Sequence, residues 1–264
     1  LLGATAGRTT LNGEGLQHED GHSHLLSATI PNCISYDPCF SYELAVIIQN
    51  GLERMIKNQE DVFYYITIMN ENYTHPEMPK NINEDIIKGI YKYSENKAKG
   101  PKVQLMGSGV ILREVIEAGN ILEKDFNVSS TIFSVTSFTE VRRNALDIQR
   151  WNMLNPDKTE KKSTLDEIII DLESPIITAT DYMKSFAEQI ATFLPNKFIS
   201  LGTDGFGRSD SREALRDFFE VDRNHIVIAA LKALTEKQEI EKSVLLSAIK
   251  KYKIMNDKPN PVSL

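Results

Sequence analysis

Short apolar runs alternate with longer segments of helical spacing over most of the chain. The pattern of buried strands, which are short and rich in β-branched residues, appears at Val103–Met106, Thr131–Val135, Pro175–Ala179 and Lys197–Leu201. Between the first two runs, apolar residues recur at helical spacing through Val110–Lys124. This alternation predicts an α/β fold with a mostly parallel sheet that helices cover on both faces.

Polar residues beside these runs predict where the later helices begin. Asp181 is expected to cap a helix over Tyr182–Leu194, because a carboxylate there accepts from the free N–H groups of the first turn. Asp210 with Glu213 fits a capping box for the next helix, and Asp222 is expected to cap the helix after that.

The first part of the chain has fewer regular segments. Cys33–Tyr36 can form a short strand, and Ser41–Lys57 carries its apolar residues at helical spacing. The aromatic and β-branched run Val62–Met69 is typical of a buried strand. The polar stretch Thr74–Glu84 contains two prolines and follows that run. Because regular alternation begins after this stretch, we predict one domain over residues 1–79 and a second over residues 80–264.

Composition narrows the class of protein. Hydrophobic residues make up 41% and charged residues 25% of the 264 residues, and the formal net charge is −7. A negative surface argues against broad binding of nucleic acid or of anionic membranes. No apolar run reaches the roughly 18 residues of a membrane span, and the first ten residues lack the pattern of a secretory signal. We expect a cytoplasmic protein with Cys33 and Cys39 reduced, and the sequence is interpreted as part of a longer chain.

The densest polar cluster is Gly7–His24, with sequence GRTTLNGEGLQHEDGHSH. It holds three histidines, three carboxylates and four glycines, so it is expected to be a loop held by its surroundings. Three interpretations stay open. The two imidazoles of His22–His24 with Glu19 or Asp20 could bind a metal. His18 with Glu14 could perform acid–base chemistry, with the carboxylate orienting the ring. The cluster could also be purely structural.

This cluster and Ile30–Pro38, IPNCISYDP, resemble the pyrimidine-binding middle domain of the bacterial homodimeric pyruvate dehydrogenase E1 family. Transketolases share a looser pattern, but His18 stands before Glu19 here and matches the E1 form. Further similar stretches are Tyr64–Tyr73 (YYITIMNENY), Ser134–Glu140 (SVTSFTE), Arg150–Leu154 (RWNML), Thr180–Lys184 (TDYMK) and Leu201–Arg212 (LGTDGFGRSDSR).

The resemblance implies the end of a transketolase-like pyrimidine-binding domain, followed by a transketolase C-terminal-like domain. It also implies an enzyme that decarboxylates pyruvate with thiamine diphosphate and transfers the acetyl unit to a lipoyl group of its E2 partner, as a homodimer. By this match, His18 handles a proton or a hydrogen bond to the pyruvate carboxylate, and Glu14 holds His18 or a nearby water. Asp20 and His24 correspond to substrate-facing residues of transketolases, and a structural role for them is equally open.

The resemblance also predicts what the chain does not contain. The family binds the diphosphate and Mg²⁺ through a Gly-Asp-Gly motif followed by Asn, and no such pairing occurs here. No metal site is therefore expected in these residues. Gly107–Gly109 is interpreted as a tight strand-to-helix turn, and Gly202–Asp210 mainly as a turn and interface element. The rival functions are transketolase, another 2-oxo-acid dehydrogenase E1, and a non-catalytic interaction module.

Overall fold

Two separate sheets organise the computed structural model, which describes residues 7–264. Residues 1–6 lie outside the described range. They form part of the first ten residues, in which the sequence shows no pattern of a secretory signal. The described strands are β1 (Cys33–Tyr36), β2 (Phe63–Ile66), β3 (Tyr91–Glu95), β4 (Lys102–Gly107), β5 (Ser129–Ser134), β6 (Ile176–Ala179) and β7 (Phe198–Leu201).

The larger sheet has the strand order β3-β5-β4-β6-β7. β5, β4, β6 and β7 pair in parallel, and only β3 is antiparallel, at the edge beside β5. The prediction of an α/β fold with a mostly parallel sheet is confirmed. The smaller sheet contains β1 and β2, which pair in parallel.

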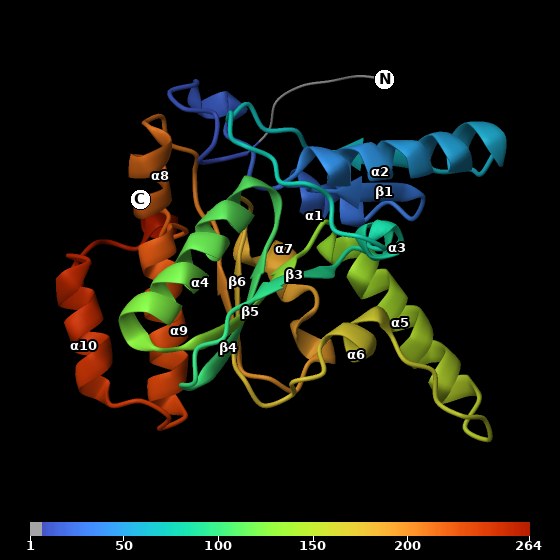
Figure 1. Ribbon diagram of the computed structural model, residues 1–264. Helices are drawn as coiled ribbons and strands as arrows, with labels where there is room; N and C mark the ends of the chain where they lie inside the picture. Colours follow the sequence, from blue (N-terminus) through green and yellow to red (C-terminus); the bar gives the residue numbers. More distant parts are fainter. Residues whose placement is uncertain (1–6) are drawn as a thin grey trace.

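Helices cover both faces of the larger sheet (Figure 1). The α-helices are α1 (Ser23–Ala28), α2 (Ser41–Leu52), α3 (Asn83–Lys88), α4 (Leu112–Phe126), α5 (Phe138–Leu154), α6 (Thr164–Ile168), α7 (Lys184–Glu188), α8 (Arg212–Phe218), α9 (Arg223–Glu236) and α10 (Lys242–Lys251). Shorter turns are η1 (Leu16–His18), the π-helical η2 (Glu53–Lys57), η3 (Gly109–Ile111), η4 (Ala191–Phe193) and η5 (Pro261–Ser263). None of the helices within residues 7–264 has both the length and the apolar character that a membrane crossing requires.

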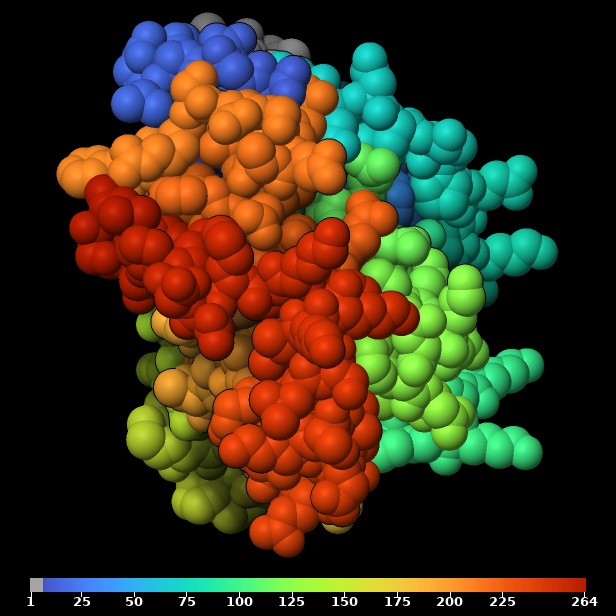
Figure 2. Space-filling view, turned by 90° about the vertical axis from the view of Figure 1, so that its left-hand side faces the viewer, coloured from blue at the N-terminus to red at the C-terminus, as the bar shows by residue number. Residues whose placement is uncertain are grey.

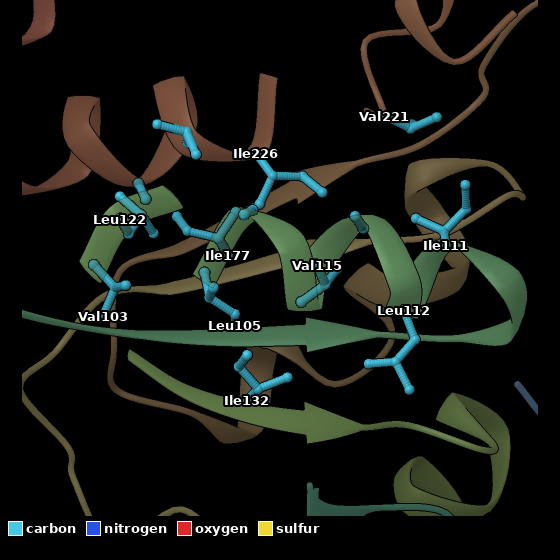
Figure 3. Packing of buried hydrophobic residues seen from close by; sticks show 14 of the residues in the cluster. Val103, Leu105, Ile111, Leu112, Val115, Leu122, Ile132, Ile177, Val221 and Ile226 are labelled. Carbon is cyan, nitrogen blue, oxygen red and sulfur yellow. The ribbon is translucent and has the colours of Figure 1, made fainter. Parts of the chain in front are cut away.

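Alternating side chains of the sheet supply two separate cores. Leu105 of β4, Ile132 of β5 and Ile177 of β6 pack with α4 and α9 on one face. Figure 3 shows this face, where Val115 of α4 lies close to the strands. Neighbouring strand residues, such as Met106, contribute to the core that contains α5, α6 and α7 on the other face. Burial on both faces explains why these strands are continuous apolar runs.

Several expected elements differ from the structure. The helix expected over Tyr182–Leu194 is confined to the short α7 and η4, and Asp181 does not cap it. α8 is capped by Ser211, whose side chain accepts from the N–H of Ala214, rather than by Asp210. Asp222 does cap α9, as predicted, by accepting from the N–H of His225 at 2.8 Å.

The strand expected to be buried at Val62–Met69 is shorter and more exposed than its sequence suggests. β2 covers only Phe63–Ile66, and Phe63 is 44% exposed. In the described chain β2 pairs with β1 and with no other strand, so part of its apolar surface has no neighbour. Aromatic and β-branched residues indicate a strand that favours burial, but the apolar side chains of β2 are only partly buried.

Candidate functional site

Polar residues that directly follow four strands form one buried hydrogen-bonded network. The Thr67 hydroxyl after β2 donates to Asp37 Oδ1 after β1, at 2.7 Å. The Ser108 hydroxyl after β4 donates to Asp37 Oδ2 at 2.9 Å, and its oxygen lies 3.0 Å from Thr180 Oγ1 after β6. The carboxyl ends of parallel strands lie at one edge, where α/β proteins build their sites. Here that edge joins the smaller sheet to the larger one.

Asp37 is the centre of this network. Burial raises the pKa of its carboxyl to about 7, although the two hydroxyl donors oppose the shift. Gly109 has φ +50°, and a Cβ at this position would lie 2.5 Å from Asp37 Oδ2. The turn predicted at Gly107–Gly109 therefore lets the backbone approach a buried carboxyl. Its Gly109 N–H donates to the Asp37 carbonyl at 2.9 Å, so this N–H already has a protein partner.

Asp181 fixes the start of the polar cluster instead of capping a helix. Its Oδ1 accepts from the Thr9 N–H at 3.0 Å and from the Thr9 hydroxyl at 2.6 Å. Its Oδ2 accepts from the Arg8 N–H at 3.1 Å and from the Thr10 hydroxyl at 2.8 Å. Burial raises the pKa of Asp181, against the effect of these donors and of the Arg216 charge. The carboxylate thereby holds three consecutive residues in place.

Arg8 extends this anchor toward the last strand. Its guanidinium donates to the carbonyl of Thr203 at 2.7 Å and to that of Gly205, and its Nη2 lies 3.3 Å from His22 Nδ1. Gly21 has no side chain where the guanidinium passes, since a Cβ there would lie 2.5 Å from Arg8 Cζ. Burial lowers the pKa of Arg8, and Asp181 opposes that shift. A fully buried arginine therefore ties both ends of the polar loop to the turn after β7.

His18 and Glu14 lie on the exposed part of this loop. His18 ends η1, where its N–H donates to the Gly15 carbonyl at 2.9 Å. Both side chains are exposed, and no hydrogen bond joins them within residues 7–264. The structure thus presents an accessible imidazole on an anchored loop, and the expected pairing of Glu14 with His18 stays a prediction.

Asp20 has a local role in the chain. Its Oδ1 accepts from the N–H groups of His22 and Ser23, both at 3.0 Å, and its Oδ2 accepts from the Ser23 hydroxyl. These bonds satisfy N–H groups at the start of α1. The carboxylate therefore orders the loop as it enters the helix.

His24 is sealed among aromatic rings. Its ring stacks on Phe186 at 4.7 Å and meets Tyr182 edge-on at 4.6 Å, while Nε2 lies 3.0 Å from Thr67 Oγ1. Burial lowers the pKa of His24 to about 3, so the ring is neutral near pH 7. His22, by contrast, is exposed and faces the Arg8 cation. This arrangement does not favour a metal shared by the two histidines.

Glu19 is a notable residue that the sequence did not single out for acid–base chemistry. It is 5% exposed, and neither carboxylate oxygen has a hydrogen-bond partner in the part of the chain described. Burial first, and Asp181 second, raise the pKa of Glu19 to about 7. The sequence had named Glu19 only as a possible metal ligand beside His22 and His24.

One group of possible metal ligands occurs within the described residues, at Asp217, Asp222 and His225. Asp222 already accepts from the N–H of His225 and lies 2.8 Å from its ring Nδ1. This cluster is explained by the capping of α9, and His225 is a hydrogen-bonded structural residue.

Comparison with known proteins identifies two family models along the chain. The pyruvate dehydrogenase E1 component middle domain matches residues 1–76, and the transketolase-like C-terminal domain matches residues 89–222. Among curated relatives, the pyruvate dehydrogenase E1 component of Cupriavidus necator is 54% identical over 266 residues, covering 100% of this chain and 30% of the relative. That of Escherichia coli strain K12 is 56% identical over 263 residues, covering 99% of this chain and 29% of the relative.

Solved structures support the fold. Transketolase from Campylobacter jejuni superposes with a TM-score of 0.62 at 16% identity, covering 86% of this chain and 30% of that chain. A split-gene transketolase, described as an inactive beta4 tetramer, gives a TM-score of 0.54 at 15% identity over 88% of this chain and 64% of its own. The chain therefore has a transketolase-like fold and spans about 30% of the curated relatives' length.

Proposed function

Because this chain belongs to the pyruvate dehydrogenase E1 family and corresponds to its C-terminal part, we propose that it supplies the His18 loop to an enzyme that decarboxylates pyruvate. The proposed enzyme transfers the acetyl unit to a lipoyl group of an E2 partner, as a cytoplasmic homodimer. The observation that carries the proposal is an exposed imidazole on a loop whose base is held by the buried residues Arg8 and Asp181.

Thiamine diphosphate with Mg²⁺ is the cofactor proposed for the complete enzyme, where it supplies the carbanion chemistry. Carboxylate and carbonyl oxygens are the ligands that Mg²⁺ requires. The carboxylates at the strand ends, Asp37 and Asp181, are fully buried and already accept from protein donors. These two carboxylates therefore do not fit a magnesium–diphosphate site.

The residues of this chain have narrower roles in the proposal. The His18 ring donates or accepts a proton, or donates a hydrogen bond to the pyruvate carboxylate, because an imidazole can serve as both acid and base and this one is accessible. Glu14, four residues earlier, orients that ring or a water beside it. Asp20 and His24 act on the substrate side only indirectly, by ordering the loop and its junction with α1.

The deciding experiment is an assay of the complete gene product that contains these residues. With thiamine diphosphate, Mg²⁺ and pyruvate, we expect reductive acetylation of a free lipoyl domain. Turnover of 2-oxoglutarate but not pyruvate would favour a different 2-oxo-acid dehydrogenase, and turnover of a ketose phosphate would favour transketolase. Absence of turnover with all three substrates would favour a non-catalytic module and contradict the proposal.

A further inference from the structure

The turn after β7 forms a platform beneath the polar loop. We call residues 202–212 the loop seat. Figure 2 shows the first described residues, in blue, lying directly against the orange segment that contains the seat. This segment contains the glycine-rich stretch Gly202–Asp210, which is interpreted from the sequence mainly as a turn and interface element. α8, which follows it, has seven residues and is too short for a helix-terminal anion site.

Two arginines join the loop to its seat from opposite sides. Arg8 of the loop donates to the carbonyls of Thr203 and Gly205 in the seat. Arg212 of the seat donates from Nε to the Thr10 carbonyl at 2.7 Å. These charge-assisted bonds link residues that are about 200 positions apart in sequence, with separations of 195, 197 and 202. They fix the base of the loop but do not reach η1.

The contact nearest to His18 is steric. Gly207 is buried, and a Cβ built on it would lie 2.3 Å from Glu19 Cβ, 3.0 Å from Glu19 Cγ and 3.3 Å from the Leu16 carbonyl oxygen. Glu19 Cβ is attached to the backbone and cannot rotate away as the end of a long side chain can. A side chain at position 207 would therefore force the seat and the turn that carries His18 apart.

We propose that Gly207 is a positioning residue that sets where η1 presents His18, and this inference rests on the proposed function. The polar loop can lie this close to the loop seat only because position 207 has no side chain. The two arginines hold the loop base, while Gly207 determines how close Leu16–Glu19 settles. A displacement of about 1 Å in a reacting group can cost roughly 10²-fold in rate.

The test compares three variants in the complete gene product with pyruvate as substrate. Gly207→Ala is expected to lower kcat by about 10²-fold. The control Ser209→Ala, at an exposed position of the same seat, is expected to keep wild-type kcat. Glu19→Gly added to Gly207→Ala removes the opposing Cβ, and it is expected to recover turnover relative to Gly207→Ala alone.

Wild-type kcat in Gly207→Ala, or a loss that Glu19→Gly does not relieve, would overturn the proposal. If Gly207→Ala alone does not fold, the double variant still tests the proposal. It keeps the alanine at position 207, so the proposal requires that it folds and turns over pyruvate. An inactive wild type would overturn the proposed function only. Hydrogen exchange then tests the seat, since Gly207→Ala should accelerate exchange at Leu16–Glu19, and unchanged exchange would contradict the inference.

Discussion

Two histidines six residues apart, His18 in η1 and His24 in α1, have opposite chemical environments. His18 is exposed and has no hydrogen bond to its ring in the described part of the chain, whereas His24 is fully buried and neutral. A proton-transfer group needs access to its substrate. At the residue scale, therefore, His18 is the candidate for chemistry and His24 is a packing residue of α1.

Replacing His18 tests this division. In the complete gene product, His18→Ala is expected to lower kcat for pyruvate by roughly 10²–10⁴-fold, the usual loss when acid–base assistance is removed. His75→Ala, at another exposed histidine outside the loop, is the matched control and should retain activity. Undiminished turnover in His18→Ala would remove His18 from the proposed mechanism.

His24 predicts a pH dependence of stability. Its pKa is about 3 in the fold, below the ordinary value of 6.5, so the unfolded chain binds this proton first as the pH falls. The stabilisation is therefore complete above pH 6.5 and is lost as the pH falls through the range between 6.5 and 3. The slope cannot exceed about 1.4 kcal/mol per pH unit for one proton.

Urea unfolding of the chain between pH 4 and pH 7 measures this slope. His24→Gln has no titrating ring, so its free energy of unfolding should fall less steeply with decreasing pH than that of the wild type. Parallel curves for the two proteins would show that the pKa of His24 is not depressed in the fold.

Elements with a continuous apolar pattern were predictable, and those defined by distant contacts were not. The expected strand at Val103–Met106 became β4, and Val110–Lys124 became η3 and α4, because each buries a regular set of apolar residues. α5 was not predicted because few of its side chains are buried, so its apolar stripe is sparse. β3 is a short edge strand, placed by its antiparallel pairing with β5.

Capping residues were also hard to predict where distant contacts determine the role of the side chain. Asp181 has the sequence context of a cap, but its carboxylate accepts from Thr9 and Thr10 instead. The polar loop itself was recognised from its composition. Its anchors were not, because they connect residues separated by 171 to 202 positions, which local patterns do not report.

The N-cap of α8 provides a test at this scale. Ser211→Ala should lower the free energy of unfolding by about 1 kcal/mol, because its hydroxyl accepts from the Ala214 N–H. Asp210→Ala should have a smaller effect, since that carboxylate bonds only to the adjacent Ser211 N–H. Chemical denaturation measures the free energy of unfolding of both variants. A larger loss for Asp210→Ala than for Ser211→Ala would support the capping box that the sequence suggested.

At the scale of the whole molecule, buried polar contacts join segments far apart in sequence. Asp37 links the smaller sheet to β4, and Glu71 after β2 accepts from Arg113 of α4 at 2.7 Å and from Arg216 of α8. Burial raises the pKa of Glu71, but the hydrogen bonds and charges of Arg216 and Arg113 outweigh burial and leave this pKa below its ordinary value. The domain boundary near residue 80 stays a prediction, since these contacts cross it.

The whole chain should lack a complete cofactor site by itself. Calorimetric titration of thiamine diphosphate with Mg²⁺ into the 264 residues is expected to give no saturable heat, because the buried carboxylates at the strand ends already have protein partners. The complete gene product, titrated in the same way, is the positive control. Stoichiometric binding to the 264-residue chain would show that a diphosphate site exists within it.

The anchoring of the loop also orders events in time during synthesis. A ribosome makes Gly7–Gly21 before its partners Asp181, Thr203 and Arg212, which emerge some 170 to 200 residues later, as the separations of 173 and 202 imply. Until then the loop has no surface on which to settle. The segment that presents His18 is therefore translated well before the residues that anchor it. A nascent chain stopped before the seat would expose an unanchored loop.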